Sequence, residues 1–162
     1  MVINGKEINF EYTIGAFCDY SDYCAAHPDV SMIRANIYKA VYMNKAYCEL
    51  HGGEAITIEE IMKMPKSDYM MLMEAVKEAE NAGEIRTVET RDNTKKKGQQ
   101  IDMNRSWFIY HGHMMNMTRD ETMMTRYGEF LDLMACDAIM TGKAKYKRPK
   151  KKMNHDEMLK VR

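Results

Sequence analysis

Residues 57–73 read TIEEIMKMPKSDYMMLM, and residues 118–134 read TRDETMMTRYGEFLDLM. Each stretch opens with Thr-x-x-Glu, a capping box in which the hydroxyl and the carboxylate satisfy free amides at a helix start. Each stretch then places a short helix before a break and a longer helix after it. At an offset of 61 residues the stretches share Thr57/Thr118, Glu60/Glu121, Met62/Met123, Leu72/Leu133 and Met73/Met134. These identities are too few to establish a repeat, but they indicate one helix–break–helix design used twice.

The segments around these stretches are also mainly helical in pattern. Thr13 can cap a helix that runs to about Ala26, and Ser31 can cap another that ends at Gly52-Gly53. Ser67 is expected to cap the helix that closes at Gly83, and the last helix should close at Gly142. The apolar spacing predicts three inner faces: Ile14, Phe17, Cys18 and Ala25; Ile33, Ile37, Ala40, Val41 and Cys48; and Tyr127, Phe130, Leu131, Met134 and Ala138.

The chain begins with the pattern of a β-hairpin. Asn4-Gly5 favours a two-residue type I′ turn, because both central positions need positive φ. Ile8, Phe10 and Tyr12 then alternate with polar residues, as in a strand with one buried face. A lone two-stranded ribbon is marginally stable, so this hairpin should lean on the helices. The sequence predicts a mainly α fold with a small N-terminal β-hairpin (α+β), a compact helical domain followed by a helical C-terminal extension.

Composition divides the chain into four segments. We expect a hairpin plus helical domain over 1–83, a charged linker over 84–106, a helical extension over 107–142 and a basic tail over 143–162. Lys95-Lys96-Lys97 lies at the centre of the polar linker. The tail contains KRPKKK at 147–152, and its composition is typical of disorder at least as far as Asn154.

Charge and cysteine content narrow the class of protein. The 24 basic and 24 acidic residues balance, which argues against a nucleic-acid binder that uses its whole domain. No apolar run approaches the roughly 18 residues that span a membrane, and residues 1–6 do not resemble a signal peptide. We therefore expect a cytoplasmic protein. Its four cysteines, Cys18, Cys24, Cys48 and Cys136, should be reduced, buried thiols that act as small hydrophobes.

No pattern of catalytic or metal-binding residues emerges. His111 and His113 could form a metal site with Cys136 or Asp120, but their spacing matches no established ligand pattern. The chain has no Gly-rich phosphate loop and no serine in a nucleophile elbow. We expect no enzymatic activity, no metal and no cofactor.

Methionine is the unusual residue, with 18 among 162. Its flexible, polarizable side chain fills irregular cores, and it also coats surfaces that accept varied apolar partners. Both uses stay open from composition. The candidate partner-binding residues are Met70, Met71, Met73, Met114, Met115, Met117, Met123 and Met124.

The opening INGKE at 3–7, followed directly by an amphipathic helix, resembles the start of the tail assembly chaperones of long-tailed phages and prophages. The stretch from Trp107-Phe108 through residues 126–133, RYGEFLDL, is similar to the C-terminal extension of that family's longer products. The two regions together cover most of the chain. The resemblance implies a non-catalytic protein that binds the tape measure protein and recruits tail tube subunits during virion morphogenesis. It also implies action in the bacterial host cytoplasm and absence from the mature virion.

One further point about gene expression follows from this resemblance. Family members are often made in short and long forms by ribosomal frameshifting, and Lys95-Lys96-Lys97 could be encoded by a slippery run of A. Self-association stays open.

The alternative function is a small nucleic-acid-binding regulator that uses the basic C-terminal tail. We favour the chaperone, because the basic runs lack the interleaved aromatic residues of a single-strand binder.

Overall fold

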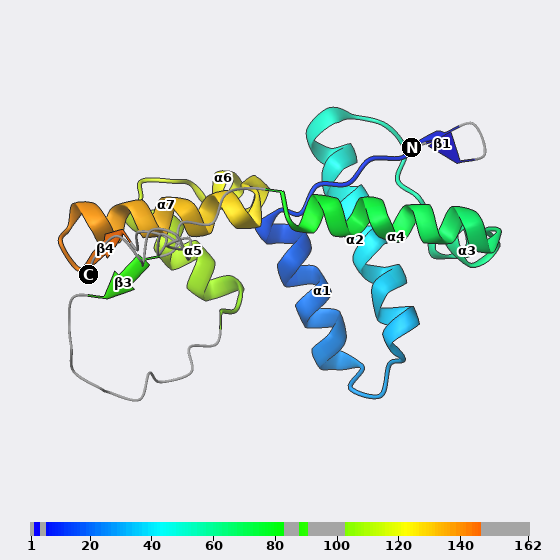
Figure 1. Ribbon diagram of the computed structural model, residues 1–162, viewed down its shortest axis with the longest axis horizontal. Coiled ribbons are helices and arrows are strands. Elements are labelled where there is room, and N and C mark those ends of the chain that lie inside the picture. Colours follow the sequence, from blue (N-terminus) through cyan, green and yellow to red (C-terminus); the bar gives the residue numbers. More distant parts are fainter. Residues whose placement is uncertain (1, 4–5, 83–87, 91–102, 147–162) are drawn as a thin grey trace, which may run out of the picture.

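The computed structural model describes residues 2–3, 6–82, 88–90 and 103–146. These ranges contain α1 (Ile14–Ala26), α2 (Met32–His51), α3 (Ile58–Met62), α4 (Lys66–Glu80), α5 (Arg105–Met114), α6 (Arg119–Met124) and α7 (Tyr127–Met140). They also contain the short strands β1 (Val2–Ile3), β2 (Lys6–Glu7), β3 (Val88–Thr90) and β4 (Ala144–Tyr146). The predicted class, mainly α with a small β element, is confirmed. In Figure 1, α1 and α2 form a helical hairpin with α5–α7 to its left, while α4 crosses α2 and extends to the right, where α3 lies.

Four of the expected helix starts are confirmed. The Thr13 hydroxyl accepts from the Ala16 amide at 3.1 Å, and Ser31 caps α2 in the same way. Both capping boxes form, so the first turns of α3 and α6 are built alike. The expected cap at Ser67 is wrong. α4 starts at Lys66, directly after Pro65 and two residues before a Ser67 cap would place its start, and the Ser67 hydroxyl donates to the Asp68 carboxylate instead.

The N-terminal hairpin forms, but it is shorter than its pattern suggested. β1 and β2 pair antiparallel, with Val2 opposite Glu7, while the turn residues 4–5 lie outside the described residues. The strand predicted to continue through Tyr12 ends at Glu7. Beyond it the backbone turns to α2 for partners, since the Glu11 amide donates to the Met43 carbonyl at 3.1 Å. The backbone beyond Glu7 therefore finds its partners outside the hairpin, in α2 at Met43 and, for residues 12–14, at residues 125–127.

A second small sheet was not expected from the sequence. β3 lies in the predicted linker and β4 at the start of the predicted tail, and they pair antiparallel with Thr90 opposite Ala144. The expectation of disorder is therefore wrong for 144–146, where Ala144 is buried. Lys95-Lys96-Lys97 and residues 147–162 lie outside the part of the chain that the structure describes.

The first hydrophobic cluster joins the N-terminal segment to α1, α2, α3 and α4. Its centre contains Met43, Ile61 and Leu72, all nearly or fully inaccessible. Ile33 departs from the predicted inner face, because its side chain is 66% exposed. It lies in the first turn of α2, close to the loop after α1, where the described chain provides nothing to cover it.

The second cluster joins α5, α6 and α7 to the other side of α1. Its fully buried members are Phe108, Phe130 and Ile14, with Cys18 beside them. α1 therefore contributes to both clusters, and Phe17 packs against each of them. All four cysteines are free thiols, as expected, but only Cys18 is buried, because the other three lie at partly covered positions.

Candidate protein-binding surfaces

The eight methionines singled out from the sequence divide into two groups in the structure. Met70, Met71, Met114 and Met124 are exposed, with accessible fractions between 38% and 67%. Met73 packs against the first cluster, while Met115, Met117 and Met123 pack against the second. Methionine therefore lies both against the core and on the surface of the described chain. The exposed group offers the larger accessible apolar surface to a partner.

The exposed methionines lie on both sides of the helical hairpin. Met70 and Met71 are neighbours on α4, which crosses α2 and extends to the right in Figure 1. Met114 ends α5 and Met124 ends α6, both on the left side. The α5 surface also carries Tyr110, 62% exposed and one helical turn before Met114. The structure thus places exposed methionines on two sides of the molecule rather than in one continuous site.

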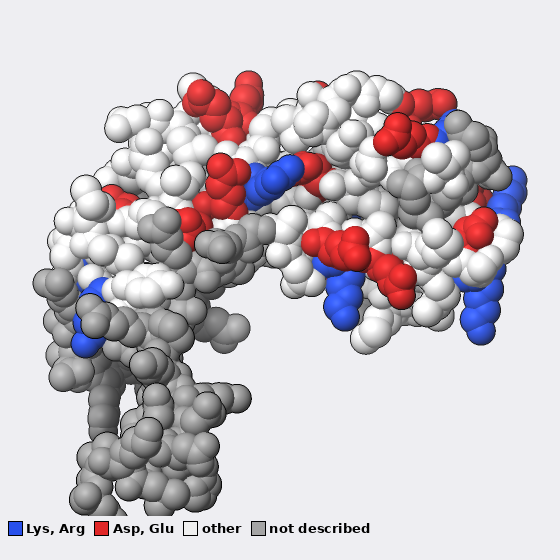
Figure 2. Space-filling view, turned by 45° about the horizontal axis from the view of Figure 1, so that its top comes forward, with Lys and Arg blue, Asp and Glu red and all other residues white. Residues whose placement is uncertain are grey.

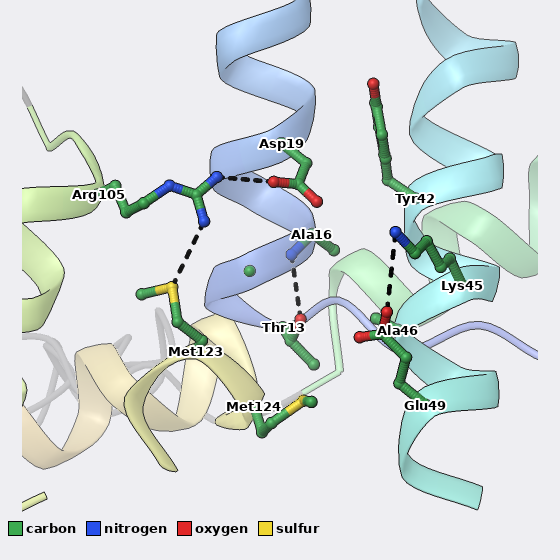
Figure 3. Close-up of a pocket in the computed structure, with 11 residues that line it drawn as sticks. Thr13, Ala16, Asp19, Tyr42, Lys45, Ala46, Glu49, Arg105, Met123 and Met124 are labelled. Carbon is green, nitrogen blue, oxygen red and sulfur yellow. Dashed lines mark hydrogen bonds and ion pairs between the residues drawn. The ribbon is translucent and has the colours of Figure 1, made fainter. Parts of the chain in front are cut away.

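A pocket of about 160 Å³ lies where the two sides meet (Figure 3). α1 and α2 form two of its walls, and Met123 and Met124 of α6 lie below them. Arg105 enters from α5 and binds Asp19 of α1 at 2.6 Å. The second nitrogen of its guanidinium group lies 3.9 Å from the Met123 sulfur. The pocket therefore has a paired charge at one side and a sulfur-lined apolar floor.

Ion pairs hold the Arg105 side chain against α1. Besides Asp19, its guanidinium group lies 3.3 Å from the Asp22 carboxylate. Hydrogen bonding to Asp19 is the first cause that raises the Arg105 pKa, so the arginine stays charged. The acceptors lie on consecutive turns of α1, and the donor starts α5. This ion pair therefore attaches the start of α5 to α1.

A second connection lies at the other end of the same junction. The Ile14 amide donates to the Thr125 carbonyl at 2.9 Å, and the Tyr127 amide donates to the Tyr12 carbonyl at 2.8 Å. Beside these bonds the Arg126 side chain donates to the carboxylate of Glu11, a residue that is only 7% exposed. Charged residues are rarely buried without a partner, and here Arg126 provides it.

No group of three His, Cys, Asp or Glu side chains that could hold a metal occurs among the described residues. His111 instead contacts the carbonyl of Trp107 through Nδ1 at 2.9 Å and lies against the Trp107 ring. Burial raises the pKa of the Cys18 thiol to about 11, which keeps it protonated and a poor nucleophile near neutral pH.

Sequence reasoning missed several features of these surfaces. Four further methionines, Met32, Met62, Met103 and Met140, are exposed on the described chain. They stand apart from the dense Met clusters, so composition did not draw attention to them. The pairs of Arg105 with Asp19 and of Arg126 with Glu11 join residues 86 and 115 positions apart. No local sequence signal marks such partners.

Comparison with known proteins adds no relative. No family model, no curated protein and no solved structure matches the chain. Among the described helices, none combines the length and the apolar character needed to cross a membrane.

Proposed function

We propose that this chain is a non-catalytic tail assembly chaperone of a long-tailed phage or prophage. In this proposal it binds the tape measure protein, keeps it soluble and recruits tail tube subunits. It acts in the host cytoplasm and is absent from the finished virion. The proposal rests on the resemblance of residues 3–7 and 107–133 to that family, together with the surfaces described above.

One observation supports this function more than any other. Exposed methionines occur on both sides of α1, with Met70 and Met71 on one side and Met114 and Met124 on the other. Methionine surfaces adapt to apolar segments of varied shape, which suits a protein that must grip many similar stretches of a long helical partner. Two such surfaces on one molecule suit a protein that brings two partners together.

Co-expression tests the first half of the proposal. We expect the full chain to increase the soluble yield of a helical tape measure fragment and to co-purify with it at moderate salt. The substitutions Met70→Gln and Met71→Gln together should reduce the co-purified fragment several-fold, because they remove apolar contact area from a surface residue pair. Met32→Gln is the matched control, since Met32 is 80% exposed and belongs to neither surface.

The second surface is tested with the tail tube protein. Met114→Gln combined with Met124→Gln should weaken recruitment of tube subunits and leave tape measure binding intact. Equal effects of both double variants on both partners would contradict the assignment of two surfaces. Failure of the unaltered chain to retain either partner would contradict the chaperone function itself.

The alternative, a nucleic-acid-binding regulator, depends on residues 147–162. These residues lie outside the described part of the chain, and no contact in the described part favours this alternative. Salt-sensitive retention of DNA with no effect on the tape measure fragment would favour it over the chaperone.

A further inference from the structure

α7 presents an outward face that the described chain leaves uncovered. Glu129, Leu133, Asp137 and Met140 follow one another at helical spacing, and we call this set the α7 outer face. Leu133 is 40% exposed and Met140 is 86% exposed, while both carboxylates lie at exposed positions. Residues 127–140 contain three acidic side chains and no Lys, Arg or His. The face is therefore apolar and acidic at once.

Charge elsewhere in the chain is complementary to this face. Residues 147–162 contain seven Lys or Arg and two Asp or Glu, so they carry a net charge of +5. Because the whole chain is neutral, residues 1–146 carry −5. Figure 2 shows Asp and Glu side chains on both sides of the molecule, with fewer Lys and Arg on the face drawn. The largest excess of positive charge thus begins directly after β4.

The positive segment directly follows β4 in the sequence, and β4 lies against α7. Gly142, with φ of 74°, lies in the turn that ends α7. The chain then forms β4, which packs against α7 and buries Ala144. Glu129 and Met140 are 11 residues apart, about 17 Å along a helix. At about 3.3 Å per residue, the six residues after Tyr146 reach about 20 Å, which is long enough to follow this face.

We propose that residues 147–152 dock on the α7 outer face of their own chain. Their cationic groups face Glu129 and Asp137, and their aliphatic stems cover Leu133 and Met140. Each exposed ion pair is weak by itself. Covalent attachment next to β4 compensates, because it raises the effective concentration of the segment at α7 to the millimolar range. This inference goes beyond the proposed function and does not depend on the partners named there.

Zero-length cross-linking of the full chain tests the proposal. A carbodiimide activates a carboxylate. A lysine amine within contact distance then displaces the activating group, which leaves as a urea, and forms an amide bond to the former carboxylate. We expect mass spectrometry of the monomer fraction to find Glu129 or Asp137 joined to Lys150, Lys151 or Lys152. High salt should reduce these products several-fold, because it screens exposed charges beyond a few ångströms.

Two double variants decide the outcome. Glu129→Gln with Asp137→Asn should remove most of the cross-links from these lysines. Glu74→Gln with Glu78→Gln, a matched exposed acidic pair on α4, should leave them unchanged. Circular dichroism checks that both variants keep the helical fold.

Three results would overturn the proposal. The cross-links could spread evenly over the acidic residues of the chain, or persist in the α7 double variant. They could also occur only in cross-linked dimers, which would make the occupant the basic segment of a second copy. Loss of the α7 cross-links on addition of a cationic peptide, by contrast, supports a face that takes this kind of segment.

Discussion

The two sides of the molecule use the same helix–break–helix design but complete their cores in different ways. The first cluster is mainly aliphatic, and its helices α2, α3 and α4 follow one another along the chain. The second is built from aromatic rings and methionines around Phe108 and Phe130, and it needs Ile14 and Cys18 from α1. Similar local patterns therefore occur beside two different cores: the buried residues of the first all lie within residues 8–76, whereas the second needs a helix from a distant part of the chain.

The two sides also differ in the close contacts that join their elements. In the first, the buried Asn44 side chain donates to the Asn9 carbonyl at 2.8 Å and accepts from the Ile56 amide at 2.7 Å. In the second, α5 approaches α6 so closely that a Cβ at Gly112 would lie 2.0 Å from the Thr122 hydroxyl oxygen. One side relies on an amide bridge between loops, and the other relies on helix contact at a glycine.

The largest expected effect comes from the centre of the second cluster. Phe108→Ala should lower the free energy of unfolding by about 3–5 kcal/mol, because Phe108 is fully buried among other rings. Urea unfolding followed by Trp107 fluorescence and by circular dichroism measures this change. Tyr110→Ala, at an exposed position on the same helix, is the control. Coincident transitions show that α1 couples the two sides, and separate transitions show independent sides.

Helix contact at Gly112 gives the next effect. Gly112→Ala should destabilise the chain by about 1–3 kcal/mol, because the added methyl group overlaps the Thr122 side chain. Thermal unfolding measures it. Adding Thr122→Ala removes the two closest atoms, so the double variant should recover part of the loss. Strictly additive losses would show that this contact is not the cause.

An effect of similar size should appear on the first side. Asn44→Ala leaves the Ile56 amide and the Asn9 carbonyl without their partner, which costs about 1–3 kcal/mol. Hydrogen exchange at the Ile56 amide should accelerate more than exchange within α5. Uniform acceleration along the chain would instead mean that Asn44 stabilises both sides equally.

The two capping boxes permit a direct comparison of the sides. Thr57→Ala and Thr118→Ala should each cost about 0.5–2 kcal/mol, because each removes one acceptor for a helix-start amide. Denaturant titration of both variants, with Thr141→Ala at a helix end as reference, measures the losses. Similar values would confirm that the two capping boxes contribute equally to the free energy of unfolding, although the cores behind them differ.

The smallest effect is a pH dependence of the same boxes. The Thr118 amide donates to Glu121 and lowers the pKa of that carboxyl, and Thr57 does the same for Glu60. A lowered folded-state pKa stabilises the protein above the unfolded value of about 4.3, and this stabilisation is lost as pH falls through the folded value. Glu121→Gln should flatten the acid limb of a stability–pH profile measured below that value. An unchanged limb would assign the slope to other carboxylates.

Local signals predicted what is local in this fold. The caps at Thr13, Thr57 and Thr118 were read correctly, because a hydroxyl finds its amide within three residues. The pairing of β3 with β4 was not predicted, since it joins residues more than fifty positions apart with no turn signal between them. Buried Glu11 was missed for the same reason, because its partner Arg126 lies in the second half of the chain.

The candidate surfaces were predictable only in part. Helical spacing identified Met70 and Met71 as side chains of one helix. Where a helix has two apolar faces, however, spacing does not show which of them another element will cover. Met115, Met117 and Met123 became core residues because α1 offered a second apolar side to pack against. That second side follows from the tertiary arrangement, which periodicity within one helix does not contain.

The double role of α1 has a consequence for synthesis on the ribosome. α1 emerges early, whereas Phe130, its partner in the second cluster, lies 112 residues after Cys18. At elongation rates of about 5–20 residues per second, this interval lasts about 6–22 s. Phe108 is made before Phe130, but until Phe130 emerges the set of rings that buries Ile14 and Cys18 stays incomplete. The nascent chain therefore presents a transient apolar stripe before it can close on itself.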